Sequence, residues 1–173
     1  DERIHGWNER LGKATRPRIG IVWSGNPHHR HDRWRSISLR DLMPFLSNEF
    51  EWISLQKDLR ADDRECLAKA PHVRHVGDSL RDFTDTAAVV SLLDMVVTVD
   101  TSVAHLAGAM GRPVWIMLPH APDWRWMLER TDSPWYPTAT LFRQTRPDEW
   151  NSLLNLLFAE LAKLFGVGAV TGD

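Results

Sequence analysis

Cysteine is almost absent from the 173 residues, since Cys66 is the single one. A chain with one cysteine forms no internal disulfide, and such usage is typical of a reducing compartment. Apolar runs long enough to span a membrane are also missing, and no basic-then-apolar leader opens the chain. We therefore expect a cytoplasmic protein without a membrane span.

Lysine and tyrosine are scarce, whereas arginine and tryptophan are abundant. There are 4 Lys against 17 Arg, and 1 Tyr against 9 Trp. Genome base composition explains an arginine excess, but guanidinium forks also suit phosphate and carboxylate groups. The net charge of −2 gives no sign of a polyanionic partner, so we expect no nucleic acid. The length fits one domain, and a start at Asp1 without methionine suggests a piece of a longer chain.

Short apolar runs alternate with helix-periodic stretches along the chain. The apolar runs predict strands at residues 18–23, 50–55, 73–76, 95–99, 113–118 and 140–143. The periodic stretches predict helices at residues 38–46, 62–70, 84–93, 102–110 and 148–165. This alternation predicts an α/β fold, a Rossmann-like three-layer sandwich with a mainly parallel sheet of about six strands. Ligands are expected at the carboxyl ends of the strands.

Three segments follow from the same pattern. Residues 1–16 are a polar lead-in with apolar residues at helical spacing, residues 17–166 are the Rossmann-like domain, and residues 167–173 are a flexible tail. Ser38 is the expected N-cap of the first helix of the domain, and Thr84 or Asp85 that of the third. Gly111 is placed to end the helix before it.

The turn from the apolar strand at 95–99 into the next helix carries the sharpest local signal. A helix start offers unpaired amide N–H groups and a positive dipole end, which together bind anions. Thr101 and Ser102 add hydroxyl donors, and His105 lies on the same helical face. Asp100 or Thr101 as a plain N-cap, with His105 as an ordinary helix histidine, remains an alternative.

The loop after the first strand is the second signal. Gly25 permits a ligand to approach the backbone closely, and residues 28–35 are the most cationic segment of the chain. Because this loop and the turn at 100–102 open at one sheet edge, a diphosphate between them would meet arginines and a helix N-terminus. A solvated basic loop is the alternative. A metal on His28, His29 and His31 is a further option, although no carboxylate or thiolate set completes it.

Weaker signals lie at other strand ends. Gln56 and Lys57 close the second predicted strand, and Phe83 and Asp85 open a helix. Phe83 could face a base, whereas Asp85 could bind ribose hydroxyls or cap its helix. Residues 119–139 form a long loop with the run Asp-Trp-Arg-Trp at 123–126, which suits either a ligand site or indole packing.

Several familiar motifs are absent from the sequence. Without Gly-x-Gly-x-x-Gly after the first strand, or a Gly-x-x-x-x-Gly-Lys-Ser/Thr run, nicotinamide and P-loop chemistry are disfavoured. No Gly-x-Ser-x-Gly elbow is present, and Cys66 lies in a predicted helix far from any suitable histidine.

The segment at 100–109 (DTSVAHLAGA), followed by GRPVW at 111–115, resembles the donor-binding motif of family 9 glycosyltransferases, the ADP-heptose:lipopolysaccharide heptosyltransferases and their relatives. The sequence is most similar to a group in which such a domain ends a tetratricopeptide-repeat protein. This likeness covers residues 18–161. It includes the motifs VWSGNP at 22–27, DRWRSI at 32–37, SLQK at 54–57, DFTDTAA at 82–88, APDWRW at 121–126 and SPWYP at 133–137.

The resemblance implies the donor-binding half of a GT-B enzyme, which transfers a sugar to a protein or glycan acceptor and needs no metal or other cofactor. Asp100 would contact sugar hydroxyls, and Thr101, Ser102 and His105 the diphosphate. The full donor-binding set that it implies is Ser24, Gly25, Asn26, Arg35, Ser36, Gln56, Lys57, Phe83, Asp85, Thr86, Asp100, Thr101, Ser102 and His105. Ser102 stands where heptosyltransferases often have glycine. Their phosphate-binding lysine is missing here, and Arg35 is the candidate to take its place.

The partners implied are a nucleotide-diphosphate sugar, an N-terminal GT-B half and tetratricopeptide repeats in the same chain. Because the catalytic base of the family belongs to the other half, no catalytic residue is assigned here, and we expect this chain alone to bind nucleotide but transfer little. Two alternatives stay open. One is a degenerate domain kept as a binding or scaffolding module, and the other is a non-transferase GT-B enzyme such as an epimerase.

Overall fold

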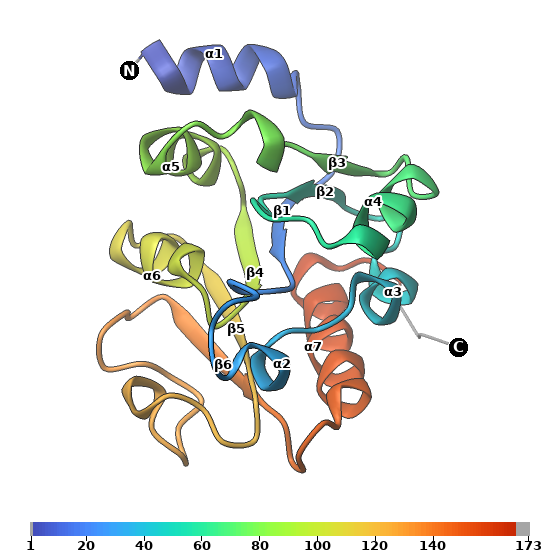
Figure 1. Cartoon of the computed structure of the whole chain (residues 1–173). Helices are drawn as coiled ribbons and strands as arrows, with labels where there is room; N and C mark the ends of the chain where they lie inside the picture. Colours follow the sequence, from blue (N-terminus) through green and yellow to red (C-terminus); the bar gives the residue numbers. More distant parts are fainter. Residues whose placement is uncertain (1, 169–173) are drawn as a thin grey trace.

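The computed structural model describes residues 2–168, so the end of the expected tail, 169–173, lies outside the described residues. A single sheet has the strand order β3-β2-β1-β4-β5-β6, and every neighbouring pair is parallel (Figure 1). The strands are β1 (Arg18–Val22), β2 (Glu51–Ser54), β3 (Val73–His75), β4 (Met95–Val99), β5 (Val114–Leu118) and β6 (Ala139–Arg143). The predicted Rossmann-like α/β fold is confirmed.

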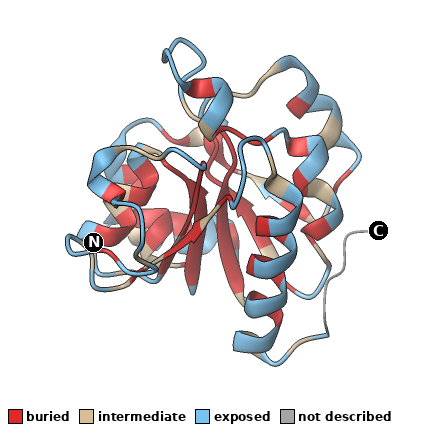
Figure 2. Ribbon diagram, turned by 90° about the horizontal axis from the view of Figure 1, so that it is seen from below, coloured by how far each residue is buried: buried red, intermediate tan, exposed pale blue. Residues whose placement is uncertain are grey.

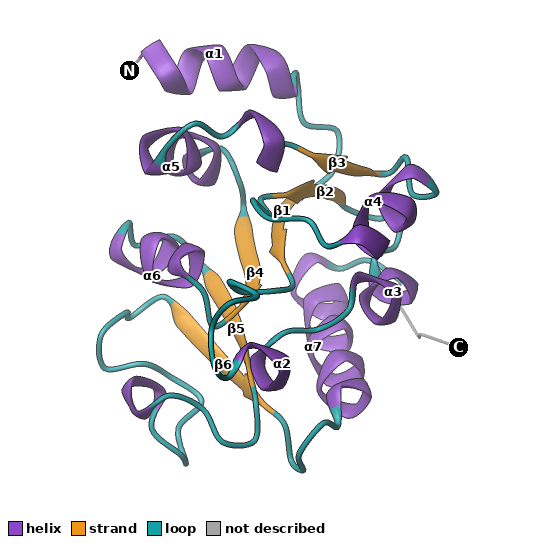
Figure 3. Ribbon diagram, viewed as in Figure 1, coloured by secondary structure: helices purple, strands orange, loops and turns teal. Residues whose placement is uncertain are grey.

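Helices cover both faces of this sheet. They are α1 (Glu2–Leu11), α2 (Asp32–Arg35), α3 (Leu39–Leu42), α4 (Ala61–Ala68), α5 (Phe83–Ser91), α6 (Ser102–Ala109) and α7 (Trp150–Phe165), with 3₁₀ turns η1 (Met43–Phe45), η2 (Gly77–Ser79) and η3 (Trp124–Trp126). None of the helices in the described part of the chain is long and apolar enough to cross a membrane. Figure 3 shows the long β5–β6 connection as loop apart from η3.

The sheet is buried because its strands are apolar on both sides. Successive residues of β4 alternate between two cores: Met95 and Val97 pack with α3 and α7, and Val96 packs with α5 and α6. All five residues of β1 and of β4 are buried (Figure 2). Near-continuous apolar strands are typical of a parallel sheet covered on both faces. Helix α1 adds an outer layer, since Trp7 and Leu11 pack in the core beside α5.

The start of α5 differs from the prediction. The N-cap of α5 is Asp82, not Thr84 or Asp85, because its carboxylate accepts the backbone N–H groups of Thr84 and Asp85, both at 2.9 Å. Ser38 caps α3 as predicted, but the predicted helix at 38–46 is split into α3 and η1. Gly111 follows the C-cap of α6 with φ of 64°, as expected of a glycine that ends a helix.

Glu51 ties the sheet to the segment before β1, and we expect it to make stability acid-sensitive. Its carboxylate accepts hydrogen bonds from the Thr15 N–H at 2.7 Å and the Arg18 guanidinium at 2.8 Å. Burial raises the pKa of Glu51, but these hydrogen bonds outweigh it and lower the pKa from 4.5 to about 2. Since the folded pKa is the lower one, the stabilisation is complete above the unfolded pKa and is lost as pH falls toward about 2.

Unfolding by urea near pH 6 and near pH 3 measures this loss. Partial exposure screens the charge, so we expect the parent chain to lose about 1 to 2 kcal/mol more than Glu51→Gln between the two conditions. An equal acid dependence in both chains would show that Glu51 is not the group responsible.

Candidate functional site

The sheet has its topological switch point between β1 and β4. From these neighbouring strands the chain continues in opposite directions, to β2 on one side and to β5 on the other. The loops that follow them therefore separate and leave a crevice at the carboxyl edge, where ligands of such sheets bind. The Arg35 guanidinium bridges the two loops by donating to the Asp100 carbonyl oxygen at 3.2 Å. The predicted meeting of these two segments is thus present.

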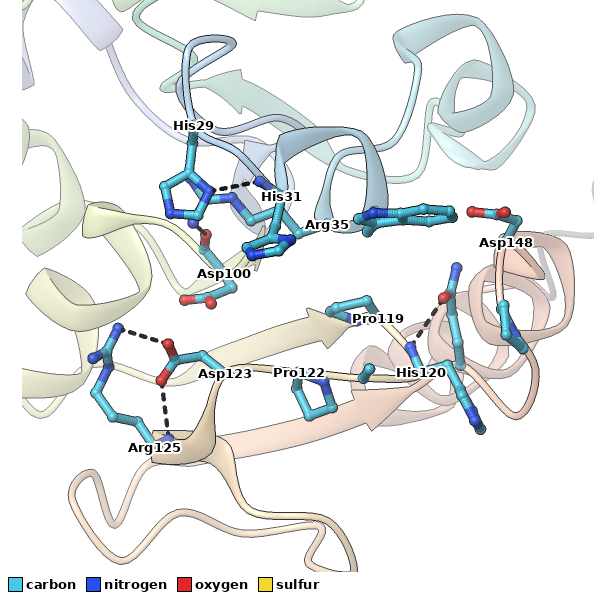
Figure 4. Close-up of a pocket in the computed structure, with 14 residues that line it drawn as sticks. His29, His31, Arg35, Asp100, Pro119, His120, Pro122, Asp123, Arg125 and Asp148 are labelled. Carbon is cyan, nitrogen blue, oxygen red and sulfur yellow. Dashed lines mark hydrogen bonds and ion pairs between the residues drawn. The ribbon is translucent and has the colours of Figure 1, made fainter.

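A cavity of about 440 Å³ opens at this edge (Figure 4). Its walls come from the loops after β1, β4, β5 and β6. The lining residues are His29, His31, Trp34, Arg35, Asp100, Pro119, His120, Ala121, Pro122, Asp123, Arg125, Gln144, Pro147 and Asp148. Of the predicted donor-binding residues, Arg35 and Asp100 line it.

The side chain of Arg35 is what approaches the Gly25 backbone closely. A Cβ atom at Gly25 would lie 2.6 Å from Nη2 of Arg35, so the guanidinium passes directly over this backbone. Nε of Arg35 is buried without a hydrogen-bond partner, and Oδ1 of Asp32 lies 4.0 Å from it. Gly25 therefore lets Arg35 reach the crevice between β1 and β4.

The other predicted residues around the β1 loop hold its shape. The Gln56 carboxamide accepts from the N–H groups of Trp23 and Ser24 and donates to the carbonyls of Ser24 and Asp58. The Ser36 hydroxyl accepts the Gly25 N–H at 3.0 Å and donates to buried Asp32 at 2.7 Å. These contacts hold the loop after β1 in place, so Gln56 and Ser36 position this wall of the cavity.

Ser24 and Asn26 differ in exposure. The Ser24 hydroxyl is buried without a partner, whereas Asn26 is exposed and accepts the His28 N–H at 2.9 Å. Neither side chain lines the cavity.

The first turn of α6 keeps its amide groups uncapped by side chains. Thr101 has the extended N-cap conformation, yet its hydroxyl pairs with the Thr98 hydroxyl at 3.0 Å instead of capping the helix. Ser102 at the first helical position is exposed. The positive end of α6 is thus without a side-chain cap and directly follows Asp100, which lines the cavity, although neither Thr101 nor Ser102 lines it.

His105 is held by the long β5–β6 loop. Its ring stacks on buried Trp126 with centroids 5.2 Å apart, and Nδ1 shares a hydrogen bond with the Tyr136 hydroxyl at 2.9 Å. Nε2 lies 3.9 Å from the Asp100 carboxylate, too far for a direct hydrogen bond. A Cβ at Gly108 would lie 2.4 Å from the Tyr136 ring, so this glycine admits the tyrosine. The run at 123–126 was expected to form either a ligand site or packed indoles, and Trp126 is a packed, buried indole.

The structure does not bring four further residues of the predicted donor-binding set into the cavity, namely Lys57, Phe83, Asp85 and Thr86. Lys57 donates to the Gly77 and Leu80 carbonyls, Thr86 donates to the Asp82 carbonyl, and Phe83 is 59% exposed. The Asp85 carboxylate is buried between Arg81 and Arg3. The Arg81 hydrogen bond, opposed by burial, holds the pKa of Asp85 well below its usual range.

The three histidines proposed as metal ligands do not converge. Nδ1 of His29 accepts the His31 N–H at 3.2 Å. Within residues 2–168 no group of three or more His, Cys, Asp or Glu side chains is arranged to hold a metal ion.

Sequence reasoning missed the residues that follow β6, chiefly Gln144 and Asp148. Gln144 is 4% exposed, and its Oε1 accepts the His120 N–H at 3.1 Å. Asp148 has φ of 59°, which few residues other than glycine adopt. The available signal was a polar residue directly after a strand, the position that drew attention to Gln56.

Residues 79–118 match the model of glycosyltransferase family 9 (heptosyltransferase), and no curated protein matches the chain. The matched segment is under a quarter of the chain and runs from the end of η2 to the end of β5. The chain is therefore similar to glycosyltransferase family 9 in the stretch that contains the turn from β4 into α6.

Proposed function

We propose that this domain binds the nucleotide-diphosphate sugar of a glycosyltransferase reaction, as the donor-binding half of a two-domain enzyme. The observation that carries the proposal is the Arg35–Asp100 bridge at the switch point, beside the open first turn of α6. The family match across β4 and α6 supports the same reading. The acceptor is a protein or a glycan, and the other half and tetratricopeptide repeats belong to the same full-length chain.

The proposed chemistry is stabilisation of a leaving diphosphate. When the bond from the sugar to the diphosphate breaks, negative charge grows on the phosphate oxygens. A guanidinium and aligned backbone amides that are already in place stabilise that charge without reorganising. Arg35 and the α6 dipole supply positive charge at this point, so the transfer needs no metal ion from this domain. The base that activates the acceptor comes from the other half.

Calorimetric titration with UDP, GDP, ADP and CMP, each with and without magnesium, tests the proposal. We expect saturable binding of one nucleotide. Arg35→Gln should weaken it about 10- to 100-fold, because a charge-assisted hydrogen bond to phosphate is lost. The double variant Thr101→Ala/His105→Ala should weaken it as well.

Arg30→Gln is the matched control, since Arg30 lies on the same loop but does not line the cavity. It removes the same charge and should leave the affinity unchanged within about twofold. Equal losses in both variants would reduce the effect to general loop charge, and absence of binding in the parent chain would contradict the proposal. Turnover by this chain alone on a defined acceptor would contradict the need for a second half.

A further inference from the structure

The cavity has two ends of different chemistry. One end, next to α6, contains Arg35 and Asp100, and the other, next to α7, contains His120 and Asp148 (Figure 4). Gln144, which is hydrogen-bonded to His120, and Pro147, which precedes Asp148, also line the cavity and belong to the α7 end. We propose that this α7 end holds the sugar of the donor, with the Gln144 side-chain amide donating a hydrogen bond to a sugar oxygen. The inference rests on the proposed function, because it takes the α6 end as the diphosphate site.

Gln144 is fixed rigidly in place. Its backbone N–H donates to the Leu118 carbonyl at 3.0 Å and so extends the β5–β6 ladder by one residue. Its Oε1 accepts the His120 N–H, the contact drawn at His120 in Figure 4. Since a backbone N–H needs an acceptor, this bond settles which end of the carboxamide is oxygen. The amide nitrogen is therefore the free end.

That nitrogen is a buried donor without an acceptor. Gln144 is 4% exposed and lines the cavity, yet Nε2 has no hydrogen-bond partner. A buried donor left unpaired costs free energy, so such groups normally have a partner. An oxygen of a ligand in the cavity would supply it.

Gln56 provides an internal comparison. Gln144 directly follows β6 and Gln56 lies two residues after β2, and both side chains accept backbone N–H groups of a neighbouring loop. The Gln56 amide nitrogen is satisfied by two backbone carbonyls, those of Ser24 and Asp58. The carboxamide of Gln144 performs the same loop-holding task with its oxygen alone, which leaves its nitrogen for a ligand.

The charges at the α7 end favour a neutral, hydroxyl-rich group. The cationic residues that line the cavity are Arg35 and Arg125, and Arg125 pairs with Asp123 at 3.3 Å. At the α7 end stands the Asp148 carboxylate, which points into the cavity (Figure 4). The Asp100 carboxylate at the α6 end has Arg35 and the positive end of α6 beside it, and these offset its repulsion of a phosphate. The Asp148 carboxylate has neither beside it, so it disfavours a phosphate but accepts hydrogen bonds from sugar hydroxyls, while an amide donates to them. Trp34, also in the lining, offers an apolar ring for a sugar face.

Paired titrations of the 173-residue chain test the inference. The ligands are UDP against UDP-glucose and UDP-N-acetylglucosamine, ADP against ADP-glucose, and GDP against GDP-mannose. The quantity measured is the sugar increment, which is the ratio of the Kd of the nucleoside diphosphate to that of its sugar conjugate. We expect an increment in one pair that Gln144→Met lowers about three- to tenfold, with the Kd of the nucleoside diphosphate unchanged.

Two further variants provide a second test and a control. Trp34→Leu changes a part-exposed ring on the loop after β1 and should lower the increment even if Gln144→Met folds poorly. Thr145→Val is the matched control, since Thr145 is exposed, adjacent to Gln144 and outside the lining. It should leave both constants unchanged.

The outcomes separate the inference from the proposed function. If Gln144→Met weakens the nucleoside diphosphate as much as its sugar conjugate, the nucleoside occupies the α7 end and the inference is wrong. It is also wrong if no pair shows an increment, or if neither Gln144→Met nor Trp34→Leu changes one. Failure of every nucleotide to bind the parent chain overturns the proposed function itself, whereas Arg35-dependent binding without a sugar increment overturns the inference alone.

Discussion

Replacing Gly77 by alanine is expected to destabilise the domain by about 3 kcal/mol, because the new methyl group would collide with backbone. A Cβ atom at Gly77 would lie 1.9 Å from the carbonyl oxygen of Gln56 and 2.8 Å from its carbonyl carbon. Backbone atoms of a buried residue at a strand end do not rotate away as a flexible side chain does. The turn η2 would have to move off the carboxyl end of β2, where Gln56 holds the β1 loop.

Chemical denaturation of Gly77→Ala against the parent chain measures the effect. Gly6→Ala is the matched control, since a Cβ at Gly6 meets nothing within 4 Å and the residue lies inside α1. That change should stabilise the chain by about 0.5 to 1 kcal/mol, because alanine favours helix over glycine. A Gly77→Ala chain as stable as the parent would show that η2 shifts freely, and the described packing at β2 would then be wrong.

The second large effect is expected at Asp85, whose carboxylate is 1% exposed. Arg81 donates to it through Nε at 2.7 Å and Nη2 at 3.0 Å, and through its backbone N–H at 3.0 Å. Arg3 of α1 donates at 3.3 Å. Asp85→Ala removes the acceptor for all of these donors, and we expect a loss of about 2 kcal/mol in the free energy of unfolding, because the Arg81 guanidinium left behind is exposed and regains water.

Asp62→Ala is the comparison, because Asp62 is also an early helix residue but is exposed. It should cost less than about 1 kcal/mol. The same pair of variants separates two roles for Asp85. A ribose ligand would lose nucleotide affinity with little change in stability, whereas a structural ion pair loses stability first. An Asp85→Ala chain of parental stability with weakened nucleotide binding would restore the ribose role.

The order of the strands and of the longer helices was predictable because hydrophobic periodicity is a local property. The four-residue helix α2 lies inside the predicted basic loop and was not expected. The range 95–99 for β4 is confirmed without change, since an apolar, β-branched run between polar turns has few alternatives. The cap of α5 was less predictable. Asp82, Thr84 and Asp85 all suit an N-cap, and the choice depends on which backbone turns extended.

The site was predictable where it depends on strand ends alone. Asp100 directly follows β4 and Gly25 comes soon after the neighbouring β1, so a parallel sheet of this order brings these two loops together. Arg35 lies in α2, well beyond the end of β1, and reaches Asp100 because its side chain passes over Gly25. Lys57 and Asp85 have the right chemistry, but nearby backbone carbonyls and arginines satisfy them, which only tertiary contacts reveal. Gln144 enters the cavity because β6 pairs with β5, a pairing that its own sequence does not specify.

The position of β1 also governs how the domain is made. β1 is the first strand within residues 2–168, yet it lies in the middle of the sheet, and Ile19 pairs with Met95. Until residues 95–99 leave the ribosome, β1 has a partner on one side only and presents an open, apolar edge. Ribosomal pauses or truncations before β4 therefore expose an aggregation-prone edge. A split version for fragment complementation should keep β1 and β4 in one piece and be cut in the β5–β6 loop.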